Sequence, residues 1–329
     1  MFVVGGESLI DLVQEQPGTD GVVRMTAHPG GSPYNCAIAL SRLGNDTGFL
    51  CPISRDGFGT YLLGPLERAG VRPLLGERVA APTTLAVVTL DAEQKAQYEF
   101  YRYADRAFTR DGLVAALPPA IENFQIGGFC PIEQEDAAVW LEVARTAAVR
   151  GATLSIDPNV RPSLVSDFSG YKKRLSDFLD LVHLVKVSIE DLMTLEKGTL
   201  IRALPPAEEA AILERYVADY LARPHVELVV VTFGERGSRA FTRAGSASAE
   251  IYVPPVFGDT VGAGDSLMAG ILTHLAEQGN LKPGRLRGLD DRRLAAMLRF
   301  GAVVAGLNCA HKGCNPPTRP EVDAVLAAA

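Results

Sequence analysis

The 329-residue sequence has few cysteines, and they are not arranged for metal binding or cross-linking. None of the five forms a C-x-x-C pair, and they are scattered along the chain: Cys36, Cys51, Cys130, Cys309 and Cys314. An odd, dispersed set argues against a disulfide framework and against a zinc site. We therefore expect incidental or buried thiols in a reducing compartment, and a cytoplasmic protein.

Long apolar runs, a basic leader and an excess of positive charge are also missing. The longest apolar runs, such as Leu85–Leu90 and Leu228–Val231, are far shorter than the roughly 18 residues that a membrane-spanning helix needs. Met1–Glu7 contains no basic residue, so no signal peptide is visible. With 32 Lys and Arg against 39 Asp and Glu, the net charge is −7. We expect no membrane and no nucleic-acid partner.

The composition is that of a globular chain with ample core. Hydrophobic residues make up 47% and charged residues 22%, which excludes a disordered protein and a coiled coil. The length fits two average domains or one large α/β domain. No internal repeat, low-complexity tract or linker is evident, so we favour a single domain over residues 1–329.

Short β-branched segments alternate with longer segments of helical period. The expected strands are Phe2–Val4, Phe49–Ile53, Asn123–Ile126, Ala152–Ile156, Leu181–Val187 and Leu228–Phe233. The expected helices are Pro33–Leu43, Tyr61–Ala69, Asp136–Arg150, Glu208–Ala222, Asp265–Gln278 and Asp291–Leu307. This alternation predicts an α/β fold with a mostly parallel sheet covered by helices on both faces.

Two extended stretches, Val13–Thr26 and Thr83–Tyr103, interrupt the alternation. Turns are expected in them at Pro17–Gly21 and at Asp91–Gln97. Ligands of α/β sheets bind at the carboxyl ends of the strands, where a flap made of two hairpins could act as a lid. The alternative is that the hairpins extend the edge of the main sheet.

The strongest chemical signal is Gly258–Asp265, a polar, glycine-rich turn that leads into a helix. Gly262, Ala263 and Gly264 allow close approach of a ligand, and their N–H groups lie where a helix leaves its first donors unpaired. Asp265 stands beside this anion site, as a base for a hydroxyl that attacks a γ-phosphate would. The alternative is an ordinary helix entrance capped by Thr260 or Asp265.

Neither standard nucleotide-binding motif is present. The sequence contains no G-x-x-x-x-G-K-[ST], and Gly5-Gly6 lacks the rest of a G-x-G-x-x-G fingerprint. The missing fingerprint argues against a nicotinamide-dependent dehydrogenase on the same kind of sheet.

Two segments together resemble a known family. Asp259–Asp265 with Ala269-Gly270 resembles the C-terminal signature of the PfkB (ribokinase-like) carbohydrate kinases, and Gly30–Asn35 resembles their N-terminal signature. Two ordered signatures about 230 residues apart are more specific than either alone. The resemblance implies a three-layer α/β/α domain with a small β lid, ATP as phosphoryl donor and a sugar hydroxyl as acceptor.

The resemblance also implies roles for individual residues. Asp265 becomes the catalytic base, ionised at a helix N-terminus, and residues 262–264 become the anion hole. Asp11, Gly30, Gly31 and Asn35 are expected to hold the sugar, because carboxylates and amides suit hydroxyl groups. Without the family pattern, Asp11 and Asn35 would be interpreted as a turn residue and a helix cap.

Two arginines are expected near the substrates. In Asp157–Arg161, which resembles fructokinase-like members, an extended backbone would point residues 157, 159 and 161 the same way, and Arg161 could stabilise the transferred phosphate. Arg102 lies in Arg102–Asp105, which resembles a run of the fructokinases, and could reach the sugar from the lid. The alternatives are a surface salt bridge and an edge-strand arginine that prevents aggregation.

The nucleotide side is expected at three other places, at Ser188, Thr232 and Asn308. Ser188–Asp191 stands where the family has N-x-x-E, a motif tied to Mg²⁺; here Ser replaces Asn, and either Glu190 or Asp191 would order the ion. Thr232–Gly237 resembles the nucleotide-side turn, where Gly234 and Gly237 could approach ATP or simply form a tight hairpin. An ordinary acidic first turn of a helix is the alternative at Glu190.

Finer assignments rest on the resemblance alone. Asp259 and the Val261 carbonyl are expected partners for a monovalent cation, K⁺, and a homodimer would join through the lids. The favoured acceptor is fructose, with 2-keto-3-deoxygluconate, ribose or a nucleoside as alternatives. A sugar or nucleotide sensor that kept the pocket and lost the chemistry is the other class of function considered.

Overall fold

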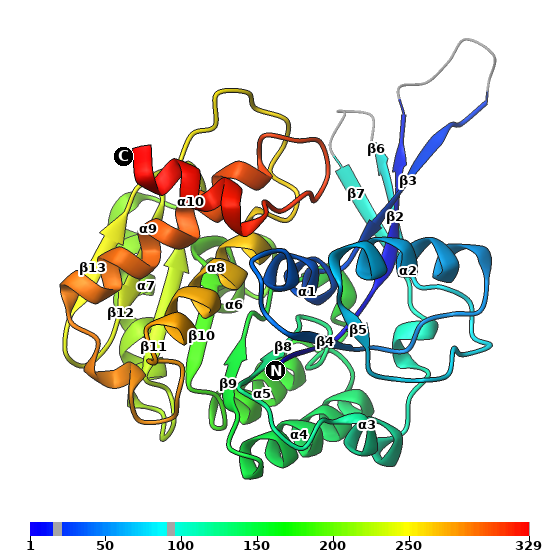
Figure 1. Ribbon diagram of the computed structural model, residues 1–329, viewed down its shortest axis with the longest axis horizontal. Coiled ribbons are helices and arrows are strands. Elements are labelled where there is room, and N and C mark those ends of the chain that lie inside the picture. The colour runs from blue at the N-terminus through cyan, green and yellow to red at the C-terminus, as the bar shows by residue number, and fades with distance from the viewer. Residues whose placement is uncertain (16–21, 91–95, 329) are drawn as a thin grey trace.

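The central element is a nine-stranded sheet, whose strands spread across Figure 1 from β13 at the left to β5 at the right. The computed structural model describes residues 1–15, 22–90 and 96–328. The strand order is β13-β12-β11-β10-β9-β8-β1-β4-β5. Their bounds are β1 Phe2–Gly5, β4 Thr47–Leu50, β5 Arg72–Pro73, β8 Asn123–Ile126, β9 Thr153–Ile156, β10 Leu184–Ser188, β11 Leu228–Thr232, β12 Ser238–Phe241 and β13 Ser246–Ala249. All neighbouring pairs are parallel except β11–β12 and β12–β13.

Helices cover both faces of this sheet, as their apolar sides require (Figure 1). One face packs against α3 Arg110–Ala116, α4 Gln134–Val149, α5 Phe168–Leu179, α6 Ile189–Lys197 and α7 Pro206–Ala222. The other packs against α1 Ser32–Arg42, α2 Gly57–Ala69, α8 Ala263–Glu277, α9 Asp291–Asn308 and α10 Arg319–Ala328. The predicted three-layer α/β/α fold with a mostly parallel sheet is therefore confirmed.

Most of the predicted alternation is present, with differences at the ends of elements. The strand expected at Phe49–Ile53 lies at Thr47–Leu50. The helix expected from Tyr61 begins at Gly57, because the Asp56 carboxylate accepts the Gly59 N–H at 2.7 Å and caps the extra turn. The helices α3, α5, α6 and α10 and the strands β5, β12 and β13 were not predicted.

A second, four-stranded sheet stands at the upper right of Figure 1, with the order β3-β2-β6-β7. Its strands are β2 Leu9–Gln14, β3 Met25–Gly30, β6 Leu85–Leu90 and β7 Ala96–Tyr101. The sheet is thus separate from the edge of the main sheet, and β2 starts only four residues after β1 ends. The two expected hairpin turns, residues 17–21 and most of 91–97, lie outside the described residues.

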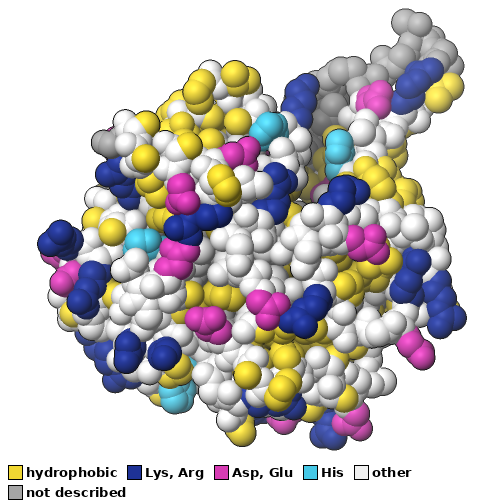
Figure 2. Space-filling view, in the orientation of Figure 1, with side chains coloured by type: hydrophobic (Ala, Val, Ile, Leu, Met, Phe, Trp, Pro, Cys, Tyr) yellow, Lys and Arg dark blue, Asp and Glu magenta, His cyan; other side chains and the backbone are white. Residues whose placement is uncertain are grey.

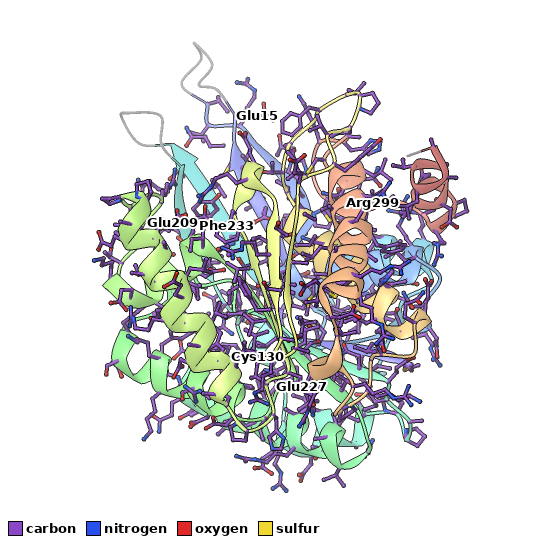
Figure 3. All side chains as sticks on the ribbon, turned by 90° about the vertical axis from the view of Figure 1, so that its left-hand side faces the viewer. Glu15, Cys130, Glu209, Glu227, Phe233 and Arg299 are labelled. Atoms are coloured by element: carbon purple, nitrogen blue, oxygen red, sulfur yellow. The ribbon has the colours of Figure 1, made fainter. Side chains whose placement is uncertain are left out.

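This lid sheet stands on the side of the main sheet where the parallel strands end. Glu227 precedes β11 and Phe233 follows it, and Figure 3 places these two residues at opposite ends of the strand. Glu15, which follows the lid strand β2, lies on the Phe233 side in the same view. The carboxyl ends of the strands therefore face the lid, as the expected position of a ligand requires.

Helix α8 is held close to α9 by two glycines. A Cβ atom on Gly270 would lie 2.9 Å from the Gly301 Cα atom, nearer than real side chains approach a backbone. This close approach lets α8 pack among α9, α1 and the sheet with a nearly fully buried surface. Among the described residues, no helix is both long and apolar enough to cross a bilayer.

Replacing Gly270 by Val should force α8 and α9 apart. We expect a loss of about 1–3 kcal/mol in the free energy of unfolding, the usual cost of overpacking a core. Urea unfolding followed by circular dichroism measures it. Gly76→Ala is the matched control, because nothing lies within 4 Å of the added methyl group. A Gly270→Val midpoint equal to that of the control would contradict the close packing of α8 on α9.

Candidate active site

The carboxylate of Asp265, in the first turn of α8, is bound by two residues of α1. Ser32 Oγ donates to Oδ1 at 2.6 Å, and Asn35 Nδ2 donates to Oδ2 at 2.9 Å. Asp265 is only 9% exposed, and Asn35 is 6% exposed. The two family-like segments, far apart in the sequence, therefore meet at one carboxyl group. Ser32 was not among the predicted site residues, although it lies within the N-terminal signature.

Asp265 was expected to be ionised because the N-terminus of a helix favours negative charge, and its burial acts in the opposite direction. Burial raises its pKa above the ordinary value, and this effect outweighs the opposing ones. The hydrogen bonds from Ser32 and Asn35 lower it, as do the charges of Lys186 and Arg161. A carboxylate with a raised pKa is a stronger base than a surface Asp, which suits proton transfer from an alcohol.

The turn before α8 has the geometry of an anion-binding site. Gly262 caps the helix with φ 74°, in the left-handed region that favours glycine, and a Cβ there would collide with the Cys314 Sγ atom. The Ala263 N–H donates to the Thr260 carbonyl at 3.1 Å. Among the described residues, the Gly262 and Gly264 N–H groups have no hydrogen bond outside the helix. Two of the three predicted donors are thus free for a ligand.

Lys186 adds a positive charge below this turn, and sequence reasoning missed it. A Cβ on Gly264 would lie 2.9 Å from the Lys186 Nζ atom. Nζ also donates to Asp157 Oδ2 at 2.6 Å, and both side chains are buried. The signal that could have revealed Lys186 is a single cation within the apolar strand Leu184–Ser188.

Three carboxyl groups, those of Asp157, Asp265 and Asp191, act on the single ammonium group of Lys186. Burial raises the pKa of Asp157 to about 6, against the lowering effect of Lys186. Burial would lower the pKa of Lys186, but the charges of Asp157, Asp265 and Asp191 raise it overall. Among the described residues, the second oxygen of Asp157, Oδ1, is buried without a hydrogen-bond partner. A buried, unpaired carboxylate oxygen is costly, and a ligand or water would satisfy it.

The prediction that residues 157, 159 and 161 point the same way along an extended backbone was wrong. Asn159 has φ 40°, a left-handed conformation that breaks the alternation. Asp157 is consequently buried against Lys186, whereas the Arg161 side chain is exposed. Arg161 still belongs to the site, because its charge lowers the pKa values of both Asp11 and Asp265.

Asp11, at the base of the lid, lies against the glycine pair of the N-terminal signature. A Cβ on Gly30 would overlap the Asp11 carboxylate, and Gly31 has φ 108° and lies close to the Glu7 carbonyl. Burial raises the pKa of Asp11 to about 6, and Arg161 opposes this. Gly30 therefore makes room for Asp11, and the contact of Gly30 and Gly31 with a sugar stays a prediction.

Arg102 is placed differently from the residues above. Its guanidinium donates twice to Asp105 Oδ2, at 2.8 and 2.7 Å, and lies over the Phe129 ring at 4.8 Å. Asp136 is a second carboxylate partner at 3.6 Å. Arg102 is thus a buried ion-pair residue at the root of the lid rather than an edge-strand arginine, and its predicted contact with the sugar stays a prediction.

The predicted nucleotide-side residues meet at the ends of two neighbouring strands. Ser188 and Thr232 are register partners, the last residues of β10 and β11. Ser188 and Asp191 form a capping box, in which Asp191 Oδ2 accepts from the Ser188 N–H and Oγ. Asp191 Oδ1 accepts the Val160 N–H at 2.8 Å. Both Asp191 oxygens are therefore occupied, and Glu190 is the carboxylate that remains half-exposed.

Gly234 and Gly237 do form the tight hairpin that was one of the two interpretations. Both have positive φ, and a Cβ on Gly237 would overlap the Ala249 carbonyl. The intervening Arg236 pairs with Glu209 of α7 at 2.7 Å and lies over the Phe233 ring. Glu209 and Phe233 stand close together on this side of the sheet in Figure 3. Approach of a nucleotide to this turn stays a prediction.

Asn308 binds the anion turn to the C-terminal loop. Its Nδ2 donates to the Val261 carbonyl at 2.7 Å, and its Oδ1 accepts the Asn315 N–H at 2.9 Å. Asp259 accepts the N–H groups of Val261 and Gly313. These groups therefore hold the turn in place, and their predicted contacts with the nucleotide and with K⁺ stay predictions. No group of three His, Cys, Asp or Glu residues suited to a metal occurs in the described part of the chain.

The surface is hollowed between the lid and the body, with Lys, Arg and His side chains on the walls (Figure 2). A hollow of about 690 Å³ lies between the lid strand β3 and the start of α2. Its lining residues, Ala27, Asp56, Gly57, Phe58 and Tyr61, include none of the predicted site residues. We therefore place the chemistry at Asp265 and not in this hollow.

Comparison with known proteins agrees with this geometry. The family model of the pfkB family carbohydrate kinases matches residues 1–321. The chain belongs to that family. This carbohydrate kinase is 31% identical to the probable fructokinase-4 of Arabidopsis thaliana, over 99% of this chain and 96% of the relative. It is also 31% identical to fructokinase-2 of Solanum lycopersicum, with the same coverage.

Solved structures of other kinases are also similar to this chain. The fructokinase with bound ATP from Xylella fastidiosa superposes with a TM-score of 0.86 and 28% identity, over 99% of this chain and 98% of that one. The ribokinase from Giardia lamblia, at 23% identity and a TM-score of 0.78, shares the fold. The family expected from the two signatures is thus confirmed over nearly the whole chain.

Removing the hydroxyl of Ser32 should raise the pKa of Asp265, because that hydrogen bond favours the charged carboxylate. If Asp265 must be ionised to act, activity is lost as pH falls through its pKa. In Ser32→Ala the acid limb of the kcat/KM profile for sugar phosphorylation should move up by about 1–2 pH units, the equivalent of one charged hydrogen bond.

The matched control is Ser41→Ala, which removes a hydroxyl from the same helix that donates to the Ala69 carbonyl. Its acid limb should coincide with that of the wild type. A Ser32→Ala profile that coincides with both would mean that the Ser32 hydrogen bond does not set the ionisation of the catalytic group.

Proposed function

We propose that this carbohydrate kinase transfers the γ-phosphate of ATP to a hydroxyl group of fructose. The observation that carries the proposal is the Asp265 carboxylate, fixed by Ser32 and Asn35 beside the free N–H groups of Gly262 and Gly264. Relatives named as fructokinases, one of them solved with bound ATP, support the choice of donor and acceptor.

The reaction needs one proton acceptor and several donors to the phosphate. The sugar oxygen attacks the γ-phosphorus, its O–H proton passes to Asp265, and the bond from phosphorus to the bridging oxygen of ADP breaks. The N–H groups of Gly262 and Gly264, with Lys186 below them, would stabilise the charge on the phosphate oxygens. Because the transition state is loose, the hydroxyl loses its proton late and a carboxylate is a sufficient base.

The acceptor would lie between the lid and α1. Asp11 and Asn35 offer a carboxylate and an amide to its hydroxyl groups, and Arg161 stands near both Asp11 and Asp265. Ribose, 2-keto-3-deoxygluconate and nucleosides differ from fructose in shape and charge, so measuring ADP release with each of them as acceptor separates these alternatives. Arg102 would contact the sugar through Nη1, which has no hydrogen-bond partner among the described residues, since Asp105 binds Nε and Nη2.

The residues present fit a magnesium ion on the nucleotide side. Bound Mg²⁺ would neutralise phosphate charge and help to orient the triphosphate. Glu190 and the unpartnered Oδ1 of Asp157 are the carboxylate oxygens there that hydrogen bonds leave available, and we propose that they hold the ion through water. Asp191 is the weaker candidate, because three donors occupy its carboxylate. A K⁺ ion at Asp259 and the Val261 carbonyl is proposed in addition.

We also propose a cytoplasmic protein with one kinase domain over the whole chain, and a homodimer joined through the lids. The lid exposes Tyr98 (50%) and Tyr101 (48%), more apolar surface than such a small sheet needs in water. Sedimentation of the full chain, with and without sugar and ATP, tests this assembly.

The proposed reaction is tested by ADP release with a panel of sugars, with and without K⁺, in wild type and in Asp265→Asn. The variant should bind fructose as the wild type does, measured by calorimetry, and lose about 10²–10⁴ in turnover, the contribution of a positioned base. Asp290→Asn, which changes the capping carboxylate of α9, is the matched control and should retain activity.

Two results would contradict the proposal. Turnover of Asp265→Asn close to the wild-type value would remove Asp265 from its role. Binding of sugars by the wild type without release of ADP would indicate a sensor that lost the chemistry.

A further inference from the structure

His28, on the lid strand β3, is paired across the lid sheet with Asp11, and it is not part of any contact described above. In the antiparallel pairing of β2 and β3, Asp11 and His28 are direct register partners. Residues opposite each other in such a pair project from the same face, with Cβ atoms about 4.5–5.5 Å apart. The two side chains therefore leave the lid from the same face, starting at neighbouring Cβ atoms.

The face that carries these two residues looks into the site. Asp11 lies against Gly30 of the same face, and the charge of Arg161, from the segment after β9, acts on it. Further along this face Phe100 packs edge-to-face on Phe129, which follows β8, with ring centres 5.7 Å apart. The face is thus directed at the carboxyl ends of β8 and β9.

The opposite face of the lid has a different environment. Leu12 and its register partner Ala27 pack against the apolar cluster that includes α1 and α2. His28 does not take part in this packing, and it is exposed. It has no hydrogen-bond or ion-pair partner in the described part of the chain, so no structural contact accounts for it.

We propose that His28 binds a hydroxyl group of the acceptor sugar next to the hydroxyl held by Asp11, and so contributes to acceptor specificity. This inference rests on the proposed function. A carboxylate accepts hydrogen bonds from hydroxyl groups, whereas an imidazole can donate to one or accept from one. Because Asp11 and His28 project from the same face of one strand pair, their side chains can bind two neighbouring hydroxyl groups of a ketose.

The role predicts a change in sugar recognition rather than in chemistry. In His28→Ala the KM for fructose should rise about 3- to 10-fold, the equivalent of one hydrogen bond, and kcat should stay within about twofold. His28→Asn, which keeps a short polar group, should recover part of the loss. Val13→Ala changes an exposed residue two positions along β2 from Asp11, on the same face, and should leave the KM unchanged.

Fructose analogues that each lack one hydroxyl group identify the contact. For one analogue, the loss of kcat/KM relative to fructose should be large in the wild type and should largely disappear in His28→Ala, because the partner is already gone. The same analogue should show its full loss in Val13→Ala. Equal losses for every analogue in wild type and His28→Ala would overturn the role of His28.

Failure of the proposed function gives a different pattern. A wild type that releases no ADP with fructose or any other sugar overturns both proposals. Wild-type turnover with fructose, together with a KM of His28→Ala equal to that of Val13→Ala, overturns only the inference on His28. Melting temperatures of the three variants equal to that of the wild type confirm that the lid residues are compared in folded proteins.

Discussion

The Asp265 carboxylate, bound by Ser32 and Asn35, is the contact on which the site depends. It joins the first turn of α1 to the first turn of α8, two helices from opposite ends of the chain. Both helices must lie on the same face of the sheet for it to form, and the glycine contact between α8 and α9 holds α8 there. The fold thus brings the two family signatures to a single carboxyl group.

Charges are concentrated in the interior around that group, which is unusual because buried charges are costly. The ammonium group of Lys186 donates a hydrogen bond to Asp157 and lies next to Gly264. One cation therefore contacts both a buried carboxylate and the glycine turn before α8. Burial raises the pKa values of Asp11, Asp157 and Asp265. Such shifts gather at functional sites, where substrates and ions supply the missing partners.

The sequence was sufficient for the layers and for the two signatures, because both are local patterns. Hydrophobic period and glycine-rich turns specify helices, strands and the residues at their ends. It was not sufficient for Lys186, whose place below Gly264 depends on how two distant strands and a helix pack. Nor did it reveal that Asn159 would adopt a left-handed conformation and separate Asp157 from Arg161, or that Asp105 would bind Arg102.

The most direct test of this account is a crystal structure of the kinase with fructose, ADP and a planar phosphate mimic such as aluminium fluoride. The account predicts one sugar hydroxyl in line with the mimic and within about 2.6–3.2 Å of an Asp265 carboxylate oxygen, the range for proton transfer. It also predicts that the Gly262 and Gly264 N–H groups donate to the mimic. A sugar whose in-line hydroxyl contacts another base, with Asp265 still bound only by Ser32 and Asn35, would contradict it.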